Sequence, residues 1–386
     1  MKQGWKTCKF ADVFDLQMGK TPSRDNPTYW GDDNMWVSIA DMNEQKYMSA
    51  TKEGITDVAV QESGIKPIPK GTVIMSFKLS IGKVSIATSK LYTNEAIMGF
   101  IEKEEGTLVP EYLYYYLKGY KWEGANKAAM GMTLNKKTIA ENTISYPPVA
   151  EQAKIVEELD CLSGIIEKKK QQLKELDNLA QSIFYEMFGD PVENDKGWEV
   201  KKIGEVCIVE RGGSPRPINA FITDDENGVN WIKIGDATEG SRFITSTKEK
   251  IIPEGVRKSR MVYKGDFILS NSMSFGKPYI MGIDGCIHDG WLVLRDKDNV
   301  FDKTYLYYYL GSSHVYQEFK RLAVGGVVNN LNSELVRGVR VAIPSFSVQQ
   351  DFASKIEAIE KQKELISQSI KETETLFNSR MDYYFN

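Results

Sequence analysis

The sequence predicts an α/β (α+β) chain of two tandem repeat units, each a mixed, strand-rich globular domain followed by a long helix. Short landmark strings recur in the same order in both halves, which is the signature of an internal duplication. In each half, segments rich in glycine and proline turns give way after a proline to helical periodicity. With 386 residues, the chain is also too long for one ordinary core.

The duplication is visible in landmarks that keep a nearly constant spacing. Trp5 recurs as Trp198, and the string YLYYYL occurs at 112–117 and again at 305–310. Further matched pairs are Gly19 and Gly212, Ser76 and Ser270, Asn135 and Asn332, and Gln152 and Gln349. Between the landmarks the two halves differ freely. This pattern indicates one unit whose scaffold was kept while its surface diverged.

The two globular segments, residues 1–146 and 197–343, contain short apolar runs that predict strands. The clearest runs are Thr72–Phe77, Val84–Ala87 and Phe267–Ser270. The tyrosine-rich segments 111–118 and 304–311 predict short helices packed on the domain body. Trp5, Trp36, Trp198 and Trp231 are expected to anchor the cores.

The segments 147–190 and 344–386 predict long helices, because glycine and proline nearly vanish and apolar residues alternate by four and three. A helix of about 38 residues would be about 57 Å long. Two matched helices in one duplicated chain favour an antiparallel coiled coil, and 191–196 reads as a polar linker. The predicted packing residues are Ile155, Leu159, Leu162, Ile166, Leu173, Leu176 and Ile183, and then Phe352, Ile356, Ile359, Ile366, Ile370 and Phe377.

Composition excludes several classes of protein. No run of 18 apolar residues exists, so no membrane span is predicted, and the N-terminus lacks the apolar core of a signal peptide, which predicts a cytoplasmic protein. The four cysteines form no CxxC pair, and only two histidines exist, His288 and His314. The net charge is −4, but residues 1–146 carry +1 and residues 197–343 carry +2, so the acid excess lies on the helices.

Motifs for catalysis are absent or incomplete. Gly19-Lys20-Thr21 resembles the end of a phosphate-binding loop, but the glycine required at position 14 is a phenylalanine. Glu199 and Lys201, with Asp190 and Asp195 upstream, are more simply a solvated charge cluster than a nuclease site. The sequence therefore predicts no catalytic residue, no metal site and no cofactor of its own.

A binding protein with two similar but divergent domains remains, and three loop families in each domain suit a polyanion. Glycine lets backbone N–H groups approach phosphates, hydroxyls donate to them, and arginine can bind phosphate or guanine. The candidate DNA-binding residues of the first domain are Lys20, Thr21, Ser23, Arg24, Lys78, Ser80, Lys83, Asn135, Lys136 and Lys137. Those of the second are Ser214, Arg216, Asn271, Ser274, Lys277, Asn330 and Asn332.

The layout resembles the specificity (S) subunit of type I restriction–modification systems across the whole chain. The features that carry this resemblance are the turn with glycine and proline near each domain start, Gly131-x-Thr133-Leu134-Asn135, and a proline-x-Glu-Gln junction before a long helix. The first junction reads Pro147 to Gln152. The second, from Pro344 to Gln349, lacks the second proline and the glutamate, so different contacts are expected there.

The resemblance implies that each globular segment is a target recognition domain that reads one half of a bipartite, asymmetric DNA target. The coiled coil would set the spacer between the half-sites and dock two methyltransferase (M) subunits, and restriction (R) subunits would join through the complex. AdoMet, ATP and Mg would bind those partner subunits, so the S subunit itself would not be an enzyme.

Three alternatives stay open on the sequence. The partner of a related restriction system could combine methyltransferase and nuclease in one fused chain. A non-DNA scaffold could carry two ligand-binding heads on a coiled coil. An enzyme would require a site that no recognised motif reveals.

Overall fold

The computed structural model describes residues 4–43, 45–123, 126–128, 131–238, 240–271, 276–323 and 331–386. The chain forms two compact units, of which unit 1 comprises residues 1–170 with 368–386, and unit 2 comprises residues 171–367. Each unit contains one strand-rich head and one half of each of two long helices. Head 1 denotes residues 4–146 and head 2 denotes residues 197–343.

The centre of head 1 is a five-stranded sheet in the order β2-β10-β6-β8-β4. Its strands are β2 (Phe14–Met18), β10 (Ile97–Glu102), β6 (Val73–Ser76), β8 (Val84–Ala87) and β4 (Tyr47–Met48). All neighbours are antiparallel except β4 and β8, which are parallel. The predicted strand Val84–Ala87 is confirmed with the same ends, and the one predicted over Thr72–Phe77 is shorter by one residue at each end.

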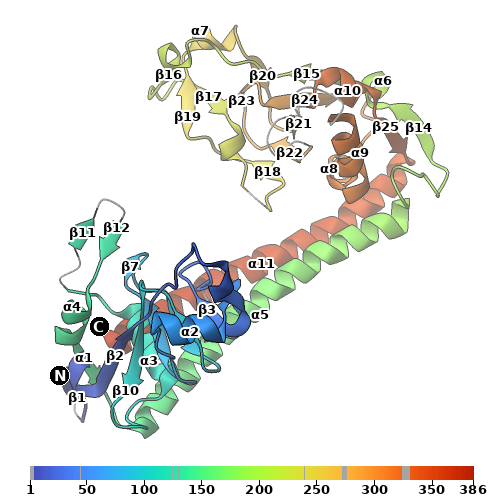
Figure 1. The fold of residues 1–386 in the computed structure, drawn as a ribbon. Helices are drawn as coiled ribbons and strands as arrows, with labels where there is room; N and C mark the ends of the chain where they lie inside the picture. Colours follow the sequence, from blue (N-terminus) through green and yellow to red (C-terminus); the bar gives the residue numbers. More distant parts are fainter. Residues whose placement is uncertain are drawn as a thin grey trace. The chain divides into compact units, whose positions relative to one another are not determined.

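Smaller sheets and short helices complete head 1 (Figure 1). A two-stranded sheet joins β1 (Lys6–Lys9) to β13 (Thr143–Tyr146). One three-stranded sheet contains β5 (Glu53–Ile55), β3 (Trp30–Val37) and β9 (Tyr92–Thr93). Another contains β11 (Asn126–Ala128), β12 (Gly131–Thr133) and β7 (Lys78–Leu79). The helices are α1 (Phe10–Val13), α2 (Asp57–Ser63), α3 (Pro110–Gly119) and α4 (Lys136–Glu141).

Head 2 repeats this architecture in the same strand order, β15-β24-β21-β22-β18. Those strands are β15 (Cys207–Arg211), β24 (Trp291–Asp296), β21 (Phe267–Ser270), β22 (Pro278–Met281) and β18 (Phe243–Ile244). A two-stranded sheet pairs β14 (Glu199–Lys202) with β25 (Arg340–Ile343), as β1 pairs with β13 in head 1. The predicted duplication is therefore confirmed at the level of sheet topology.

Head 2 enlarges the second sheet of the repeat. The strands β19 (Glu249–Ile251), β17 (Val229–Ile232) and β23 (Gly285–Ile287) match β5, β3 and β9, and β16 (Ile222–Thr223) and β20 (Arg260–Val262) extend the sheet on either side. The helices of head 2 are α6 (Ile203–Val206), α7 (Pro253–Val256), α8 (Lys303–Gly311), α9 (Ser313–Ala323) and α10 (Ser333–Gly338).

The repeated YLYYYL string forms the helix at the centre of each core. In α3 all six of these side chains are buried, because the helix packs on the sheet on one side and on the long helices on the other. Tyr112 donates a hydrogen bond to the Ser145 carbonyl at 3.1 Å, and Tyr305 of α8 donates to Ala342 at 2.8 Å. The same hydroxyl therefore holds the same strand in both units, which explains why a tyrosine was kept at this position.

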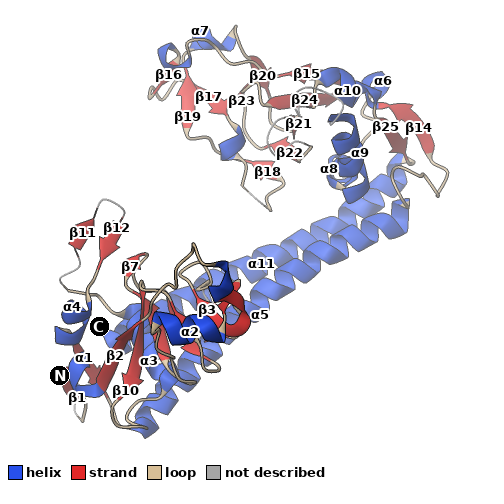
Figure 2. Ribbon diagram, in the orientation of Figure 1, coloured by secondary structure: helices blue, strands red, loops and turns tan. Residues whose placement is uncertain are grey.

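The two long helices are α5 (Val149–Phe188) and α11 (Phe346–Phe385), and each has 40 residues. In unit 1 the start of α5 packs against the end of α11, where Arg380 forms an ion pair with Glu158. In unit 2 the end of α5 packs against the start of α11, where the Lys363 ammonium lies 2.7 Å from the Asp177 carboxylate. The pairing is antiparallel within each unit, and Figure 2 shows that strands are confined to the heads. None of the described helices combines the length and apolar composition of a membrane span.

The predicted packing residues of the helices are all buried or half-buried, but several of them do more than join helix to helix. Ile155 and Leu159 belong to the core of head 1, and Phe352, Ile356 and Ile359 belong to the core of head 2. Phe184 and Phe188 of α5, which the seam did not include, are also buried in the core of unit 2. The apolar stripe is wider than a coiled-coil seam, because each helix packs on a head as well as on its partner helix.

A fully buried glutamine attaches each long helix to its head. The Gln152 amide accepts a hydrogen bond from Val109 N at 2.8 Å and donates to the carbonyls of Thr107 and Pro147 at 3.1 and 2.9 Å. Gln349 makes the equivalent three bonds, to Asp302 N at 2.8 Å and to the carbonyls of Val300 and Pro344 at 3.1 and 2.9 Å. The expectation of different contacts at the second junction is therefore wrong for its glutamine, because the bonds go to backbone groups that need no particular neighbour.

Candidate nucleic-acid interface

The glycine shared by the first loop of both heads is required by a close approach of two backbones. A Cβ on Gly19 would lie 2.1 Å from the Thr93 carbonyl oxygen, and a Cβ on Gly212 would lie 2.1 Å from that of His288. The loop is held there by the Lys20 amide, which donates to the Thr93 carbonyl at 2.8 Å, and by the Gly213 amide, which donates to the Ile287 carbonyl at 3.1 Å. The first candidate loop therefore starts from the same fixed point in each head.

Gly212→Ala is expected to lower the free energy of unfolding of unit 2 by about 1–3 kcal/mol, because the methyl group must displace a neighbouring backbone. Gly235→Ala is the matched control, since nothing lies within 4 Å of its added Cβ. Urea denaturation of both variants measures the difference. Equal midpoints for the two variants would contradict the close-approach explanation.

In head 1, the side chains of this loop are engaged by the protein itself. Arg24 donates to both carboxylate oxygens of Glu53 at 2.7 and 2.9 Å, and its guanidinium lies 3.7 Å from the centroid of the Trp30 ring. The hydrogen bond from Arg24 lowers the pKa of the Glu53 carboxyl. Lys20 donates to the Ser63 carbonyl at 2.6 Å, and Thr21 donates to Glu95. Ser23 is exposed, and its carbonyl accepts from the Trp30 indole.

In head 2, the corresponding loop is organised around Asp289. Ser214 donates to the Asp289 carboxylate at 2.7 Å, His288 Nε2 lies 2.9 Å from it, and Arg216 reaches it only at 4.0 Å. Burial opposes ionisation of Asp289, but the Ser214 hydrogen bond and the nearby His288 and Arg211 outweigh it and lower the pKa of the carboxyl. The side chain of Arg216 is 84% exposed. The arginine of this loop is thus held in head 1 and presented to solvent in head 2.

The second candidate loop is built on a buried serine in both heads. Ser76 Oγ accepts from the Lys83 amide at 3.1 Å, and Ser270 Oγ accepts from the Lys277 amide at 3.0 Å. These serines belong to the scaffold of the two loops. Of the candidates there, Ser80 and Lys277 are exposed and Lys78 and Lys83 are half-buried.

The second loop of head 2 contains two further candidates, Asn271 and Ser274. Asn271 is only 3% exposed and donates to the Asp289 carbonyl at 2.9 Å, so it supports the loop from within. Ser274 lies outside the described residues, as does Asn330 of the third loop.

The third loop ends in a helix cap in each head. Asn135 accepts from the Thr138 amide at 2.8 Å, and Asn332 accepts from the Leu335 amide at 2.9 Å. These bonds satisfy an N–H group at the start of α4 and α10, which explains why asparagine recurs at this position. Lys136 and Lys137 are exposed in the first turn of α4.

The acidic residues near the start of head 2 have structural partners. Asp195 accepts from the Asp190 amide at 2.9 Å, and Asp190 accepts from the amides of Val192 and Glu193 at 2.8 and 3.0 Å. Lys201 pairs with Glu199 on the same strand at 3.0 Å. Within the described parts of the chain, no three His, Cys, Asp or Glu side chains gather as a metal site.

Head 2 has a groove of about 1100 Å³ next to its exposed arginine. Its lining consists of the loop 214–219, Ile222, Trp231, Lys233, Glu249 and His288. The Lys233 ammonium is paired with Glu249, and the rings of Trp231 and His288 meet edge to face at 5.9 Å. Both charges and aromatic edges therefore line one groove, a mixture that suits a polar, planar ligand.

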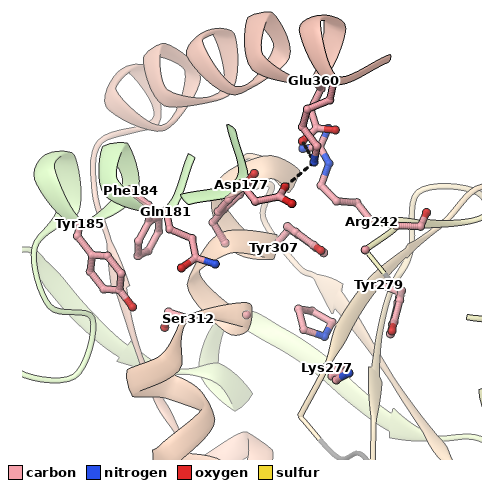
Figure 3. A pocket seen from close by; sticks show the side chains of 16 residues that line it. Asp177, Gln181, Phe184, Tyr185, Arg242, Lys277, Tyr279, Tyr307, Ser312 and Glu360 are labelled. Carbon is pink, nitrogen blue, oxygen red and sulfur yellow. Dashed lines mark hydrogen bonds and ion pairs between the residues drawn. The ribbon is translucent and has the colours of Figure 1, made fainter. Parts of the chain in front are cut away.

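A second cavity, of about 330 Å³, lies between head 2 and the long helices within unit 2 (Figure 3). Asp177, Arg242 and Glu360 gather on one side of it, with Tyr307 close by. At the equivalent place in unit 1, Lys46 forms an ion pair with Asp160, and the Tyr115 hydroxyl donates to the same carboxylate at 2.5 Å. In unit 1, the lysine that precedes the edge strand β4 is therefore bound to the long helix α5.

The structure thus brings together some of the predicted residues and adds others. Ser214 and Arg216 lie at one groove with Lys233, Glu249 and His288, which the sequence argument did not select. Only the strand register of the structure relates the two glutamates, since Trp36 pairs with Glu53 and Trp231 with Glu249. Trp36 and Trp231 are buried as expected, whereas Trp5 and Trp198 are only half-buried.

Comparison with known proteins agrees with this arrangement. The family described as "Type I restriction modification DNA specificity domain" matches residues 2–178 and 195–375. The MjaIX specificity subunit of a type I restriction enzyme from Methanocaldococcus jannaschii is 33% identical over 231 residues, which are 54% of this chain and 53% of that protein. The matched part thus spans about half the length of this curated relative.

Two solved structures share the fold. A chain from a study of "complex assembly and conformational transition of the type I R-M system" has a TM-score of 0.65 at 18% identity. The alignment covers all of this chain and 98% of that chain. The type I S subunit of M. genitalium has a TM-score of 0.53 at 14% identity, with 98% of this chain and 95% of that chain covered. Because the family matches both repeats, the chain belongs to the family of type I restriction–modification specificity (S) subunits and carries two copies of the DNA specificity domain.

Proposed function

We propose that this chain is the DNA-recognition subunit of a type I restriction–modification complex. Residues 1–146 and 197–343 are the two target recognition domains, and each reads one half of a bipartite, asymmetric DNA sequence. The observation that carries the proposal is the pairing of two specificity domains, each followed by a 40-residue helix, with those helices packed antiparallel in each unit.

The difference between the heads supports an asymmetric target. Both heads share the sheet order, the close-approach glycine and the capping asparagine, but their exposed loop residues differ. Arg24 is paired with Glu53, whereas Arg216 faces solvent. A common scaffold with unlike surface groups presents different donors and acceptors to base edges, so each head selects its own sequence.

The long helices would set the spacer between the half-sites and dock the partner chains. Two methyltransferase subunits suit a chain with an internal repeat, because each repeat presents a similar surface to an identical partner. Restriction subunits would join through the complex, and AdoMet, ATP and Mg would be held by those partners. The chain itself contributes recognition and no chemistry.

Methylome sequencing tests the proposal. A host that carries this gene with its methyltransferase partner is expected to show adenine methylation in a bipartite motif that disappears when the gene is deleted. A methyltransferase–nuclease fusion as partner would give the same motif and differ in the neighbouring gene. A non-DNA scaffold or a self-sufficient enzyme predicts an unchanged methylome.

Exchanging residues 1–146 for the matching head of another specificity subunit is expected to change one half of the methylated motif. The other half and the spacer should stay as they were, because each head has its own core and its own loops. Motif analysis of the methylome before and after the exchange is the measurement. A change in both halves would contradict modular reading.

A further inference from the structure

The same structural position is covered by the chain in head 1 and open in head 2. In head 1, Trp36 of β3 pairs in register with Glu53 of β5, and in head 2, Trp231 of β17 pairs in register with Glu249 of β19. Both tryptophans are buried, with exposures of 2% and 1%. Each head therefore has a buried tryptophan beside a glutamate at this position, and we call this pair the floor.

In head 1 the chain covers this floor itself. The Arg24 guanidinium lies 3.7 Å from the centroid of Trp30 and 5.2 Å from that of Trp36, and it binds both oxygens of Glu53. A planar group with N–H donors thus lies against the tryptophans while the glutamate accepts its hydrogens. The floor can therefore hold a planar group that carries N–H donors.

In head 2 the corresponding place is open. Arg216 extends into solvent, Glu249 is paired with Lys233, and the groove of about 1100 Å³ lies in front of Trp231. Lys233 and Glu249 are each about one-third exposed, with side-chain values of 37% and 35%, so an incoming molecule can reach both. One ammonium N–H of Lys233 is donated to one carboxylate oxygen of Glu249, so Lys233 offers its other two N–H donors and Glu249 its second oxygen.

We propose that the groove formed by loop 214–219 with Trp231, Lys233, Glu249 and His288 is the base-reading groove of head 2, and that Arg24 closes its counterpart in head 1. The proposal rests on the proposed function, in which each head binds duplex DNA. Glu249 accepts from the exocyclic amino group of a base, Lys233 donates to a neighbouring ring or carbonyl acceptor, and Arg216 holds an adjacent phosphate.

The chemistry selects a base pair over other ligands of this size. In the major groove a base pair presents an amino donor next to acceptor atoms, which matches an adjacent carboxylate and ammonium. Arg216 supplies the sequence-independent contact to the polyanion, and its exposure leaves it available for that role. Head 1 must read its half-site through other residues, because Arg24 donates to both oxygens of Glu53, whereas Lys233 donates to one oxygen of Glu249.

The experiment is methylome sequencing of hosts that carry the complete system with Glu249→Gln, Lys233→Gln or the control Glu53→Gln. The groove variants are expected to relax discrimination at one or two positions of a single half-site by about tenfold or more, the scale of losing one bidentate base contact. Glu53→Gln should leave the bases of both half-sites unchanged, because Glu53 is occupied by Arg24. Arg216→Ala should weaken methylation of all sites evenly.

The outcomes test the groove assignment and the proposed function separately. A bipartite motif that is identical in wild type and both groove variants overturns the groove assignment and leaves the proposed function standing. A wild-type system with no bipartite motif overturns both. Because a variant could fail to fold, circular dichroism melting of each purified chain accompanies the sequencing, and Glu249→Asp keeps the charge. Relaxed reading with unchanged melting supports the groove, and loss of methylation that follows loss of folding in all variants, Glu249→Asp included, overturns it.

Discussion

Gln349→Ala is expected to lower the free energy of unfolding of unit 2 by about 2–4 kcal/mol. It leaves one buried and two part-buried backbone groups without partners, and an unpaired buried group costs roughly 1–3 kcal/mol, whereas a part-buried group can bond water and costs less. The three groups are the amide of Asp302 and the carbonyls of Val300 and Pro344. Gln152→Ala should have the same effect on unit 1, where the groups are Val109, Thr107 and Pro147. The loss should loosen the start of the long helix first, because the glutamine is its attachment to the head.

Gln350→Ala is the matched control, because Gln350 is the exposed neighbour of Gln349 in the same turn of α11. Surface changes of this kind usually alter stability by less than about 0.5 kcal/mol. Amide hydrogen exchange at the start of α11 is the sharper measurement, since a chain of two units need not unfold in one step. Equal protection in the Gln349→Ala and Gln350→Ala variants would show that the glutamine does not hold the junction.

Lengthening both long helices by one heptad is expected to increase the DNA spacer and leave both half-sites intact. Seven residues that repeat the local sequence would be inserted after Lys170 in α5 and after Ser367 in α11, where the helices are continuous. Each added residue extends a helix by 1.5 Å, so seven add about 10 Å, or about three base pairs at 3.4 Å per base pair. A full heptad keeps the apolar seam in phase.

The insertion has two controls. An insertion in α5 alone leaves seven residues without a partner and shifts the seam, so it should weaken methylation without producing a new, well-defined spacer. Replacing seven exposed residues of α5 without changing its length should have no effect on the spacer. The motif is determined by methylome sequencing, and a matched double insertion that leaves the spacer unchanged would contradict the role of the helices in setting it.

Several features of the fold were predictable from the sequence because they follow from periodicity and from repetition. The 40-residue helices, the strands Val84–Ala87 and Phe267–Ser270, and the tyrosine helices all lie where the pattern of apolar residues places them. The landmarks that recur in both halves are now explained by local geometry. Gly19 and Gly212 permit a close backbone approach, Asn135 and Asn332 cap helices, and the paired glutamines satisfy backbone groups.

The candidate site was less predictable, because repetition marks the scaffold and says little about the surface. The sequence predicts DNA contacts for Asn271, Asn135 and Asn332 because they are polar residues in shared loops, but the structure gives them supporting hydrogen bonds. The sequence does not single out Glu53 or Glu249, since a single glutamate in a short strand has no distinctive pattern. The heptad pattern predicts only helix pairing, although Ile155 and Phe352 also belong to the cores of the heads.

The sequence by itself determined the duplication, the division of each repeat into a strand-rich segment and a long helix, and the positions of the repeated landmarks, because these follow from residue patterns along the chain. Only the tertiary structure decided that Arg24 lies over Trp30 and binds Glu53 while Arg216 faces solvent beside an open groove. The physical reason is that a side chain's availability depends on partners brought close by folding. Arg24 and Glu53 are 29 residues apart in the chain, and nothing in their local patterns signals that they meet.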